Sequence, residues 1–108
     1  ADELAELEER DAALSDEARS ILEKHALWLQ GQRDVRVTIE GHCDERGTVE
    51  YNLALGQKRA EAVAKSLALL GANDAQMEAV SFGKERPASQ GSDEAAWAKN
   101  RRAELVLR

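Results

Sequence analysis

The middle of the chain joins a strand pattern to a helix pattern through a short polar loop. Residues 35–40 read Val-Arg-Val-Thr-Ile-Glu, and this alternation predicts a strand with one buried face. Gly41 then lets the backbone leave the strand, because glycine tolerates turns that other residues do not. Apolar residues recur at helical intervals over about 49–70, and Gly71 ends that helix. We therefore expect the polar side chains of the junction to lie together at one end of a small sheet.

On both sides of this junction, other segments show either the helical spacing or the strand alternation of apolar residues. A helix with one apolar face is predicted over 15–31. Two more strands are predicted over 77–82 and 103–107. Between them lie an irregular loop and a short helix over about 92–99, with Trp97 expected to anchor that helix in the core. The order is helix, strand, helix, strand, short helix, strand, which indicates an α+β fold with helices packed on a small mixed sheet.

The first fourteen residues differ from the rest of the chain in composition. Residues 1–14 consist of Ala, Leu, Asp, Glu and one Arg, and the absence of β-branched and aromatic residues favours helix over strand. Leu4, Leu7 and Leu14 share a helical stripe. We therefore divide the chain into an acidic N-terminal segment, 1–14, that is helical or frayed, and a single domain over 15–108.

Composition limits the class of function. The 108 residues suffice for one domain with one core. The net charge of -6 argues against nucleic acid as a partner, because phosphate binding needs a basic face. Cys43 is the only cysteine, so neither an internal disulfide nor a multi-thiolate metal site is expected. No apolar run approaches the roughly 20 residues that span a bilayer.

The sequence offers no convincing set of catalytic or metal-binding residues. His42 and Cys43 are adjacent at a strand end, where neighbouring side chains point to opposite sides, so they do not form the nucleophile and base of thiol catalysis. A structural zinc site usually takes its four ligands from two separated pairs. We therefore interpret His42, Cys43, Asp44 and Glu45 as solvated loop residues, and we expect neither an enzyme nor a cofactor.

The same junction suits a ligand that carries both charges. The candidate residues are Asp44 in the loop, Asn52 and Arg59 on the following helix, and Arg101 and Arg102 before the last strand. Asn52 and Arg59 are separated by close to two helical turns, so they project to nearly the same side. A carboxylate accepts from an ammonium and a guanidinium binds a carboxylate, which fits the end of an α-amino acid. A direct Asp44–Arg59 ion pair, or ordinary surface charge, stays open as the alternative.

Three separated motifs resemble one known family. They are GHCDERGTVEYNLALGQKRAEAV from Gly41, SFGKERP from Ser81 and DEAAWAKNRRAEL from Asp93. In this order they resemble the OmpA-like C-terminal domain, and most closely the peptidoglycan-associated lipoproteins, over residues 15–108. The resemblance implies a two-layer α+β sandwich and a binding protein rather than an enzyme.

The resemblance also implies a ligand and roles for individual residues. Members of the family hold peptidoglycan non-covalently by the meso-diaminopimelate residue of its stem peptide. Their loop aspartate and helix arginine, which grip that amino-acid end, match Asp44 and Arg59 here, and Asn52 matches a nearby helix asparagine. The family's NRR motif matches Asn100, Arg101 and Arg102.

The resemblance further implies a location and a protein partner. The domain is expected to tether the outer membrane of a Gram-negative bacterium to the cell wall from the periplasmic side, with a lipid anchor that is not present in this chain. TolB is expected to bind a surface that overlaps the peptide site. The alternatives are a TolB-type interaction module, or an altered or engineered scaffold with weakened ligand binding.

The N-terminal segment departs from the family pattern. The family opens with a strand before the first helix, and that strand helps to form the sheet and the rim of the site. Here ELAELEERDAA occupies that place, with neither the period nor the residue types of a strand. Either the strand is lost or replaced, or this segment adopts it against its propensity. We expect a helix, and a homodimer through the altered N-terminus, because an open sheet edge invites pairing.

Overall fold

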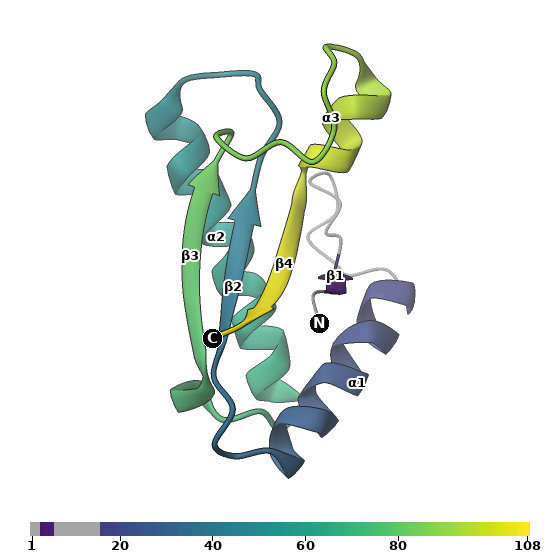
Figure 1. Cartoon of the computed structure of the whole chain (residues 1–108), viewed down its shortest axis with the longest axis vertical. Helices are drawn as coiled ribbons and strands as arrows, with labels where there is room; N and C mark the ends of the chain where they lie inside the picture. The colour runs from purple at the N-terminus through teal and green to yellow at the C-terminus, as the bar shows by residue number, and fades with distance from the viewer. Residues whose placement is uncertain (1–2, 6–15) are drawn as a thin grey trace.

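The structure, a computed structural model, describes residues 3–5 and 16–108, and Figure 1 shows their arrangement. The elements in chain order are β1 (Glu3–Ala5), α1 (Asp16–Gly31), β2 (Val37–His42), α2 (Val49–Leu69), the 3-10 helix η1 (Asp74–Gln76), β3 (Met77–Gly83), α3 (Glu94–Asn100) and β4 (Arg102–Leu107). Within the described ranges, no helix combines the length and the apolar character needed to cross a membrane. The α+β class predicted from the sequence is confirmed.

The sheet is mixed, with the strand order β1-β4-β2-β3. β2 and β3 run parallel, and α2 provides the crossover that parallel neighbours need. β4 lies antiparallel to both β1 and β2. The ends of β2 and β3 and the start of β4 therefore meet at one end of the sheet, where Figure 1 also places α3.

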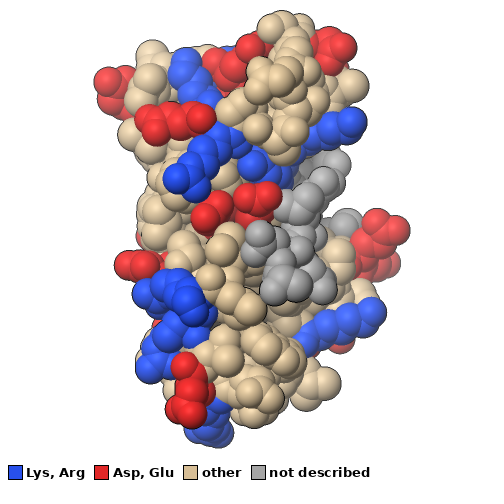
Figure 2. All heavy atoms as spheres, in the orientation of Figure 1, with Lys and Arg blue, Asp and Glu red and all other residues tan. Residues whose placement is uncertain are grey.

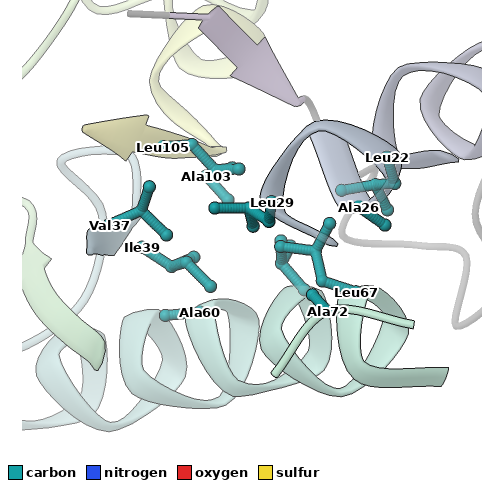
Figure 3. Close-up of a cluster of buried hydrophobic side chains, with 11 residues drawn as sticks. Leu22, Ala26, Leu29, Val37, Ile39, Ala60, Leu67, Ala72, Ala103 and Leu105 are labelled. Carbon is teal, nitrogen blue, oxygen red and sulfur yellow. The ribbon is translucent and has the colours of Figure 1, made fainter. Parts of the chain in front are cut away.

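Figure 3 shows the core, which α1 and α2 form with one face of the sheet. Both helices contribute side chains spaced three or four residues apart, and β2 and β4 contribute alternate residues, as their sequence periods predicted. The buried apolar residues include Leu22, Ala26 and Leu29 from α1, Val37 and Ile39 from β2, Ala60, Val63 and Leu67 from α2, and Ala103 and Leu105 from β4.

Two glycines set the distance between α2 and β2. A β-carbon on Gly41 would overlap the carbonyl group of Gly56, and a β-carbon on Gly56 would overlap the hydroxyl of Ser81. Backbones approach this closely only where the contacting residues carry no side chain. The contact brings α2 against the end of β2, where Asn52 accepts a hydrogen bond from Cys43.

The first long strand begins at Val37 rather than Val35. The side-chain amide of Gln76 donates to the carbonyl groups of Leu29, Gln32 and Val35 at 3.1, 2.8 and 3.1 Å. Val35 is thereby held in the turn that precedes the strand, because its carbonyl accepts from Gln76 and its N–H donates to the carbonyl of Gln32. A side chain far along the chain thus decides this boundary.

The predicted N-terminal helix is wrong at Glu3–Ala5, which form β1. This strand pairs antiparallel with β4, with Glu3 opposite Leu105 and Ala5 opposite Ala103. The other residues of the predicted helix, 1–2 and 6–14, lie outside the described residues. Helix propensity is only a few tenths of a kcal/mol per residue, whereas the edge of β4 offers unpaired backbone groups. β1 covers this edge at Ala103–Leu105, and the homodimer expected through the N-terminus stays a prediction.

Candidate functional site

The loop after β2 carries the candidate site and is held at both ends. The backbone N–H of Cys43 donates to the carbonyl of Gly83 at 2.8 Å, which ties the loop to the end of β3. Gly47 has a φ of 89°, a conformation that glycine adopts without strain. Thr48 caps α2, since its hydroxyl accepts from the N–H of Tyr51 at 3.0 Å. The loop therefore has a defined conformation.

Asn52, a predicted site residue, shapes this loop from the first turn of α2. Its side-chain amide donates to the carbonyl groups of Arg46 and Thr48 at 2.6 and 2.9 Å. Its backbone carbonyl accepts from the thiol of Cys43 at 3.3 Å. Asn52 is buried, so its role in the described geometry is to position the residues on either side of Asp44.

Asp44 is the electrostatic centre of the site. Its Oδ1 accepts from the backbone N–H and the Nε of Arg46 at 3.0 and 3.1 Å. Its Oδ2 accepts from Nη2 of Arg46 at 2.7 Å and from Nη1 of Arg101 at 3.1 Å. Burial by itself raises the pKa of this carboxyl, but the donors from Arg46 and Arg101 outweigh burial and lower the pKa of Asp44 to about 2. Asp44 is therefore an anion at neutral pH.

Arg101 connects Asp44 to α3, at the end of the molecule where Figure 2 shows acidic and basic side chains close together. Its Nη1 binds Asp44, and its Nη2 donates to Oε1 of Glu94 at 2.8 Å. The side chain is only 10% exposed. The sequence predicted that Asp44 and Arg101 converge at one end of the sheet, and the structure brings them into direct contact.

Acid unfolding tests this network. The pKa of Asp44 is about 2 in the folded chain against an ordinary value of 3.8. Because the folded value is the lower one, the network stabilises the fold above the unfolded pKa and loses this contribution as the pH falls through the folded pKa. We expect the free energy of unfolding to drop by about 2 kcal/mol between pH 5 and pH 2 from this group.

Urea denaturation at a series of pH values measures the drop. The matched control is Asp44→Asn, which keeps the size of the side chain and does not titrate. The difference between wild type and Asp44→Asn should shrink over the same pH window. A constant difference would show that Asp44 does not stabilise the fold through its charge.

A cavity of about 230 Å³ opens beside Asp44. Its lining residues are Cys43, Asp44, Arg46, Gly47, Tyr51, Asn52, Leu55 and Arg101. One part of this wall is charged, and Tyr51 and Leu55 supply an apolar part. The cavity thus combines charge recognition with a surface for a short alkyl chain.

Arg59 lies deeper than the sequence analysis suggested. Its Nη1 donates to the carbonyl of His42 and to Sγ of Cys43, the latter at 3.8 Å. The residue is 6% exposed, and it does not appear among the residues that line the cavity. In the described geometry Arg59 fixes the end of β2 beneath the loop that carries Asp44.

Asn100 and Arg102 hold the loop before α3 rather than the cavity wall. The side-chain oxygen of Asn100 accepts from the N–H groups of Ala88 and Ser89 at 2.7 and 2.9 Å. Arg102 donates to the carbonyl groups of Asn100 and Arg86 at 3.2 and 3.0 Å. Of the six predicted site residues, three line the cavity, namely Asp44, Asn52 and Arg101.

Contacts between α3 and the loop were missed by sequence reasoning. Trp97 is half-buried and was wrongly predicted to anchor α3 in the core. Its Nε1 instead donates to Glu45 at 3.1 Å, and its ring lies 4.2 Å from the guanidinium carbon of Arg46. The hydroxyl of Ser92 also donates to Glu45, at 3.2 Å. The N-cap of α3 is Asp93. The only signal for Arg46 was its position two residues after Asp44.

His42, Cys43 and Asp44 are buried, so the expectation that they are solvated loop residues was wrong, whereas Glu45 is exposed. Nε2 of His42 lies 3.1 and 3.3 Å from carboxylate oxygens of Glu40 and Glu104. Burial, followed by the nearby guanidinium of Arg102, lowers the pKa of His42. The ring is therefore neutral at pH 7 and ties the ends of β2 and β4 together.

Comparison with known proteins identifies the family. The sequence model of the OmpA family matches residues 8–101. The chain belongs to the OmpA family. A peptidoglycan-associated lipoprotein of Pseudomonas aeruginosa is 55% identical over 92 residues, which are 85% of this chain and 54% of the relative. That of Legionella pneumophila is 45% identical over 96 residues, 89% of this chain and 54% of the relative. The chain thus spans about half the length of the curated relatives it matches.

Solved structures place this OmpA-family chain among proteins of the same fold. The crystal structure of the peptidoglycan-associated lipoprotein from Burkholderia pseudomallei matches with a TM-score of 0.89 and 52% identity, covering 95% of this chain and 87% of that one. The C-terminal domain of MotB from Helicobacter pylori matches with a TM-score of 0.85 at 22% identity, covering 98% of this chain and 84% of that one. The second likeness concerns the fold alone. The resemblance inferred from the three motifs is confirmed.

Proposed function

We propose that this OmpA-family domain binds peptidoglycan non-covalently and so tethers the outer membrane to the cell wall from the periplasmic side. The names of its relatives support this function, since matches of 55% and 52% identity are peptidoglycan-associated lipoproteins. The observation that carries the proposal is Asp44, a buried carboxylate in the wall of an open cavity with two guanidinium groups beside it.

The proposed ligand is the meso-diaminopimelate residue of the stem peptide. Its free end carries an ammonium and a carboxylate on one carbon atom, and an alkyl chain connects that carbon to the peptide. Asp44 accepts from the ammonium, the alkyl chain lies against Tyr51 and Leu55, and a guanidinium binds the carboxylate. The family resemblance assigns this last contact to Arg59. Binding of this kind needs no catalytic group.

A protein partner of the TolB type is a second candidate for the same end of the domain. Three apolar side chains on the first turns of α2 are exposed, with Val49 at 44%, Tyr51 at 62% and Leu53 at 37%. Tyr51 also lines the cavity. A partner that covers this apolar rim would therefore compete with the stem peptide.

A titration followed by NMR tests the peptide assignment. The probe is a stem tripeptide that ends in meso-diaminopimelate, and the matched control is the same peptide with L-lysine in that position. We expect saturable shifts of Asp44, Asn52 and Arg101 with the first peptide at lower concentration than with the second. Absence of shifts at these residues with either peptide would refute the peptide site and favour a purely protein-binding function.

A further inference from the structure

Two carboxylates lie directly opposite each other on the outer face of the sheet. Glu40 of β2 is the cross-strand partner of Glu104 of β4. Alternation along β2 places Glu40 and His42 on the face opposite the buried Ile39. In Figure 1 this face is turned toward the viewer, with α2 behind the sheet, and Figure 2 shows the acidic and basic side chains on it. Like charges in directly opposed strand positions repel each other, so this pair needs a compensating cation.

The part of the chain that the structure describes gives this pair one guanidinium group. Nε of Arg102 lies 3.4 Å from Oε1 of Glu104 and makes no hydrogen bond. Among the described residues, no Lys or Arg side chain lies within ion-pair distance of Glu40. The side chains of Glu40 and Glu104 are only 13% and 25% exposed, so water screens their repulsion incompletely. One guanidinium therefore leaves two partly buried carboxylates undercompensated.

Both carboxylates also face the same imidazole nitrogen. Nε2 of His42 lies 3.1 Å from Oε1 of Glu40 and 3.3 Å from Oε2 of Glu104, and the three atoms lie within 4.8 Å of one another. A neutral ring donates at most one proton from Nε2, so it pairs with one carboxylate and not with both. Ligand atoms around a tetrahedral zinc ion, at bonds of about 2.0–2.2 Å, lie about 3.4 Å apart. The two distances from Nε2 are close to that spacing.

The surroundings hold these groups in the orientation that a cation requires. The ring of His42 is 1% exposed and stacks on Phe82 of β3, with the ring centroids 5.6 Å apart. Arg102 contacts Oε1 of Glu104 and leaves Oε2 toward His42. Nδ1 of His42 has no hydrogen-bond partner. Because nothing donates to Nδ1, the proton is not locked on Nε2, and it resides on Nδ1 when the lone pair of Nε2 binds a cation.

We propose that Glu40, His42 and Glu104 form a binding site for a divalent transition-metal cation, with Zn²⁺ as the best chemical match. One imidazole and two carboxylates are ligands that suit zinc, and a water molecule completes the tetrahedron. The bound cation replaces the repulsion between the two carboxylates by attraction and joins β2 to β4. None of the three residues lines the cavity beside Asp44, so this site is separate from the proposed peptide site and does not depend on it.

Calorimetric titration of the whole chain with Zn²⁺ alone at pH 7 tests the site. Wild type should bind one ion saturably. Glu40→Gln and Glu104→Gln keep the size of the side chain and remove one anionic ligand, so each should weaken the affinity by about tenfold or more. Glu78→Gln, which removes an exposed carboxylate from β3, is the matched control and should bind as wild type does. Mg²⁺ at the same concentration should give no binding, because it prefers oxygen ligands.

NMR distinguishes this site from the other histidine of the chain. Zn²⁺ should shift the ring nitrogens of His42 and leave those of His25 unchanged. It should also raise the unfolding temperature of wild type and of Glu78→Gln, but not that of Glu40→Gln. Cooperative unfolding of the Gln variants in the presence of a chelator establishes that they are folded. The proposal is overturned if wild type shows no saturable binding, if both Gln variants bind as tightly as wild type, or if the shifts occur at His25 instead of His42.

Discussion

Asp44→Ala should weaken binding of a diaminopimelate stem peptide by roughly 2–5 kcal/mol, because the ligand's ammonium would lose the buried carboxylate that we propose accepts from it. Asp44 is 5% exposed and the cavity wall beside it carries Arg46 and Arg101. Without the carboxylate, the ammonium would meet two guanidinium groups, so repulsion adds to the lost contact. Calorimetric titration with the tripeptide and a pull-down on purified peptidoglycan both measure the loss.

Two further variants test whether the loss of affinity comes from the charge of Asp44 and from the support that Arg59 gives to the loop. Asp44→Asn keeps the volume of the side chain and should lose nearly as much affinity, which assigns the effect to charge. Arg59→Ala should also weaken binding, since Arg59 holds the carbonyl of His42 beneath the loop. Pull-down by Asp44→Ala and Arg59→Ala at the wild-type level would rule out peptidoglycan binding at this site.

Gly41→Ala should lower the free energy of unfolding by about 3 kcal/mol. The new β-carbon would overlap the carbonyl of Gly56, and that atom belongs to the backbone of α2 rather than to a flexible side chain. Either the helix or the strand must move, and the core between them loses contacts. Urea denaturation at neutral pH measures the change.

Gly31→Ala is the matched control for that substitution. Gly31 is the last residue of α1, and a β-carbon there would meet nothing within 4 Å. Alanine is the better helix former, so stability should stay the same or rise slightly. Equal urea midpoints for the two alanine variants would contradict the close contact between Gly41 and Gly56.

The sequence predicted well those helix and strand boundaries that follow from the local spacing of apolar residues. The strand at β3 and the helix at α2 start where the sequence pattern placed them, because each alternation reflects one buried face. The start of β2 was misplaced because Gln76 holds the preceding turn. The strand β1 was missed because its residues favour helix locally and gain their partners from β4.

The residues of the candidate site likewise fall into those that the sequence predicted and those that depend on tertiary contacts. Asp44, Asn52 and Arg101 were predicted from residue chemistry and position, and all three line the cavity. Arg46 was overlooked because its significance depends on two contacts, with Asp44 and with Trp97, and the second joins segments far apart in the chain. Arg59 was placed on the correct side of α2, but its depth follows from the packing of α2 on β2.

The sequence by itself determined the α+β class, the family and the presence of a carboxylate and several guanidinium groups at one strand-to-helix junction. These features depend on local periodicity and on residue type, which the chain carries in order. The tertiary structure alone decided which guanidinium groups reach Asp44, that its acceptor positions are filled, and that a strand covers the edge of β4. Such features depend on distances between residues remote in the chain, and packing sets those distances.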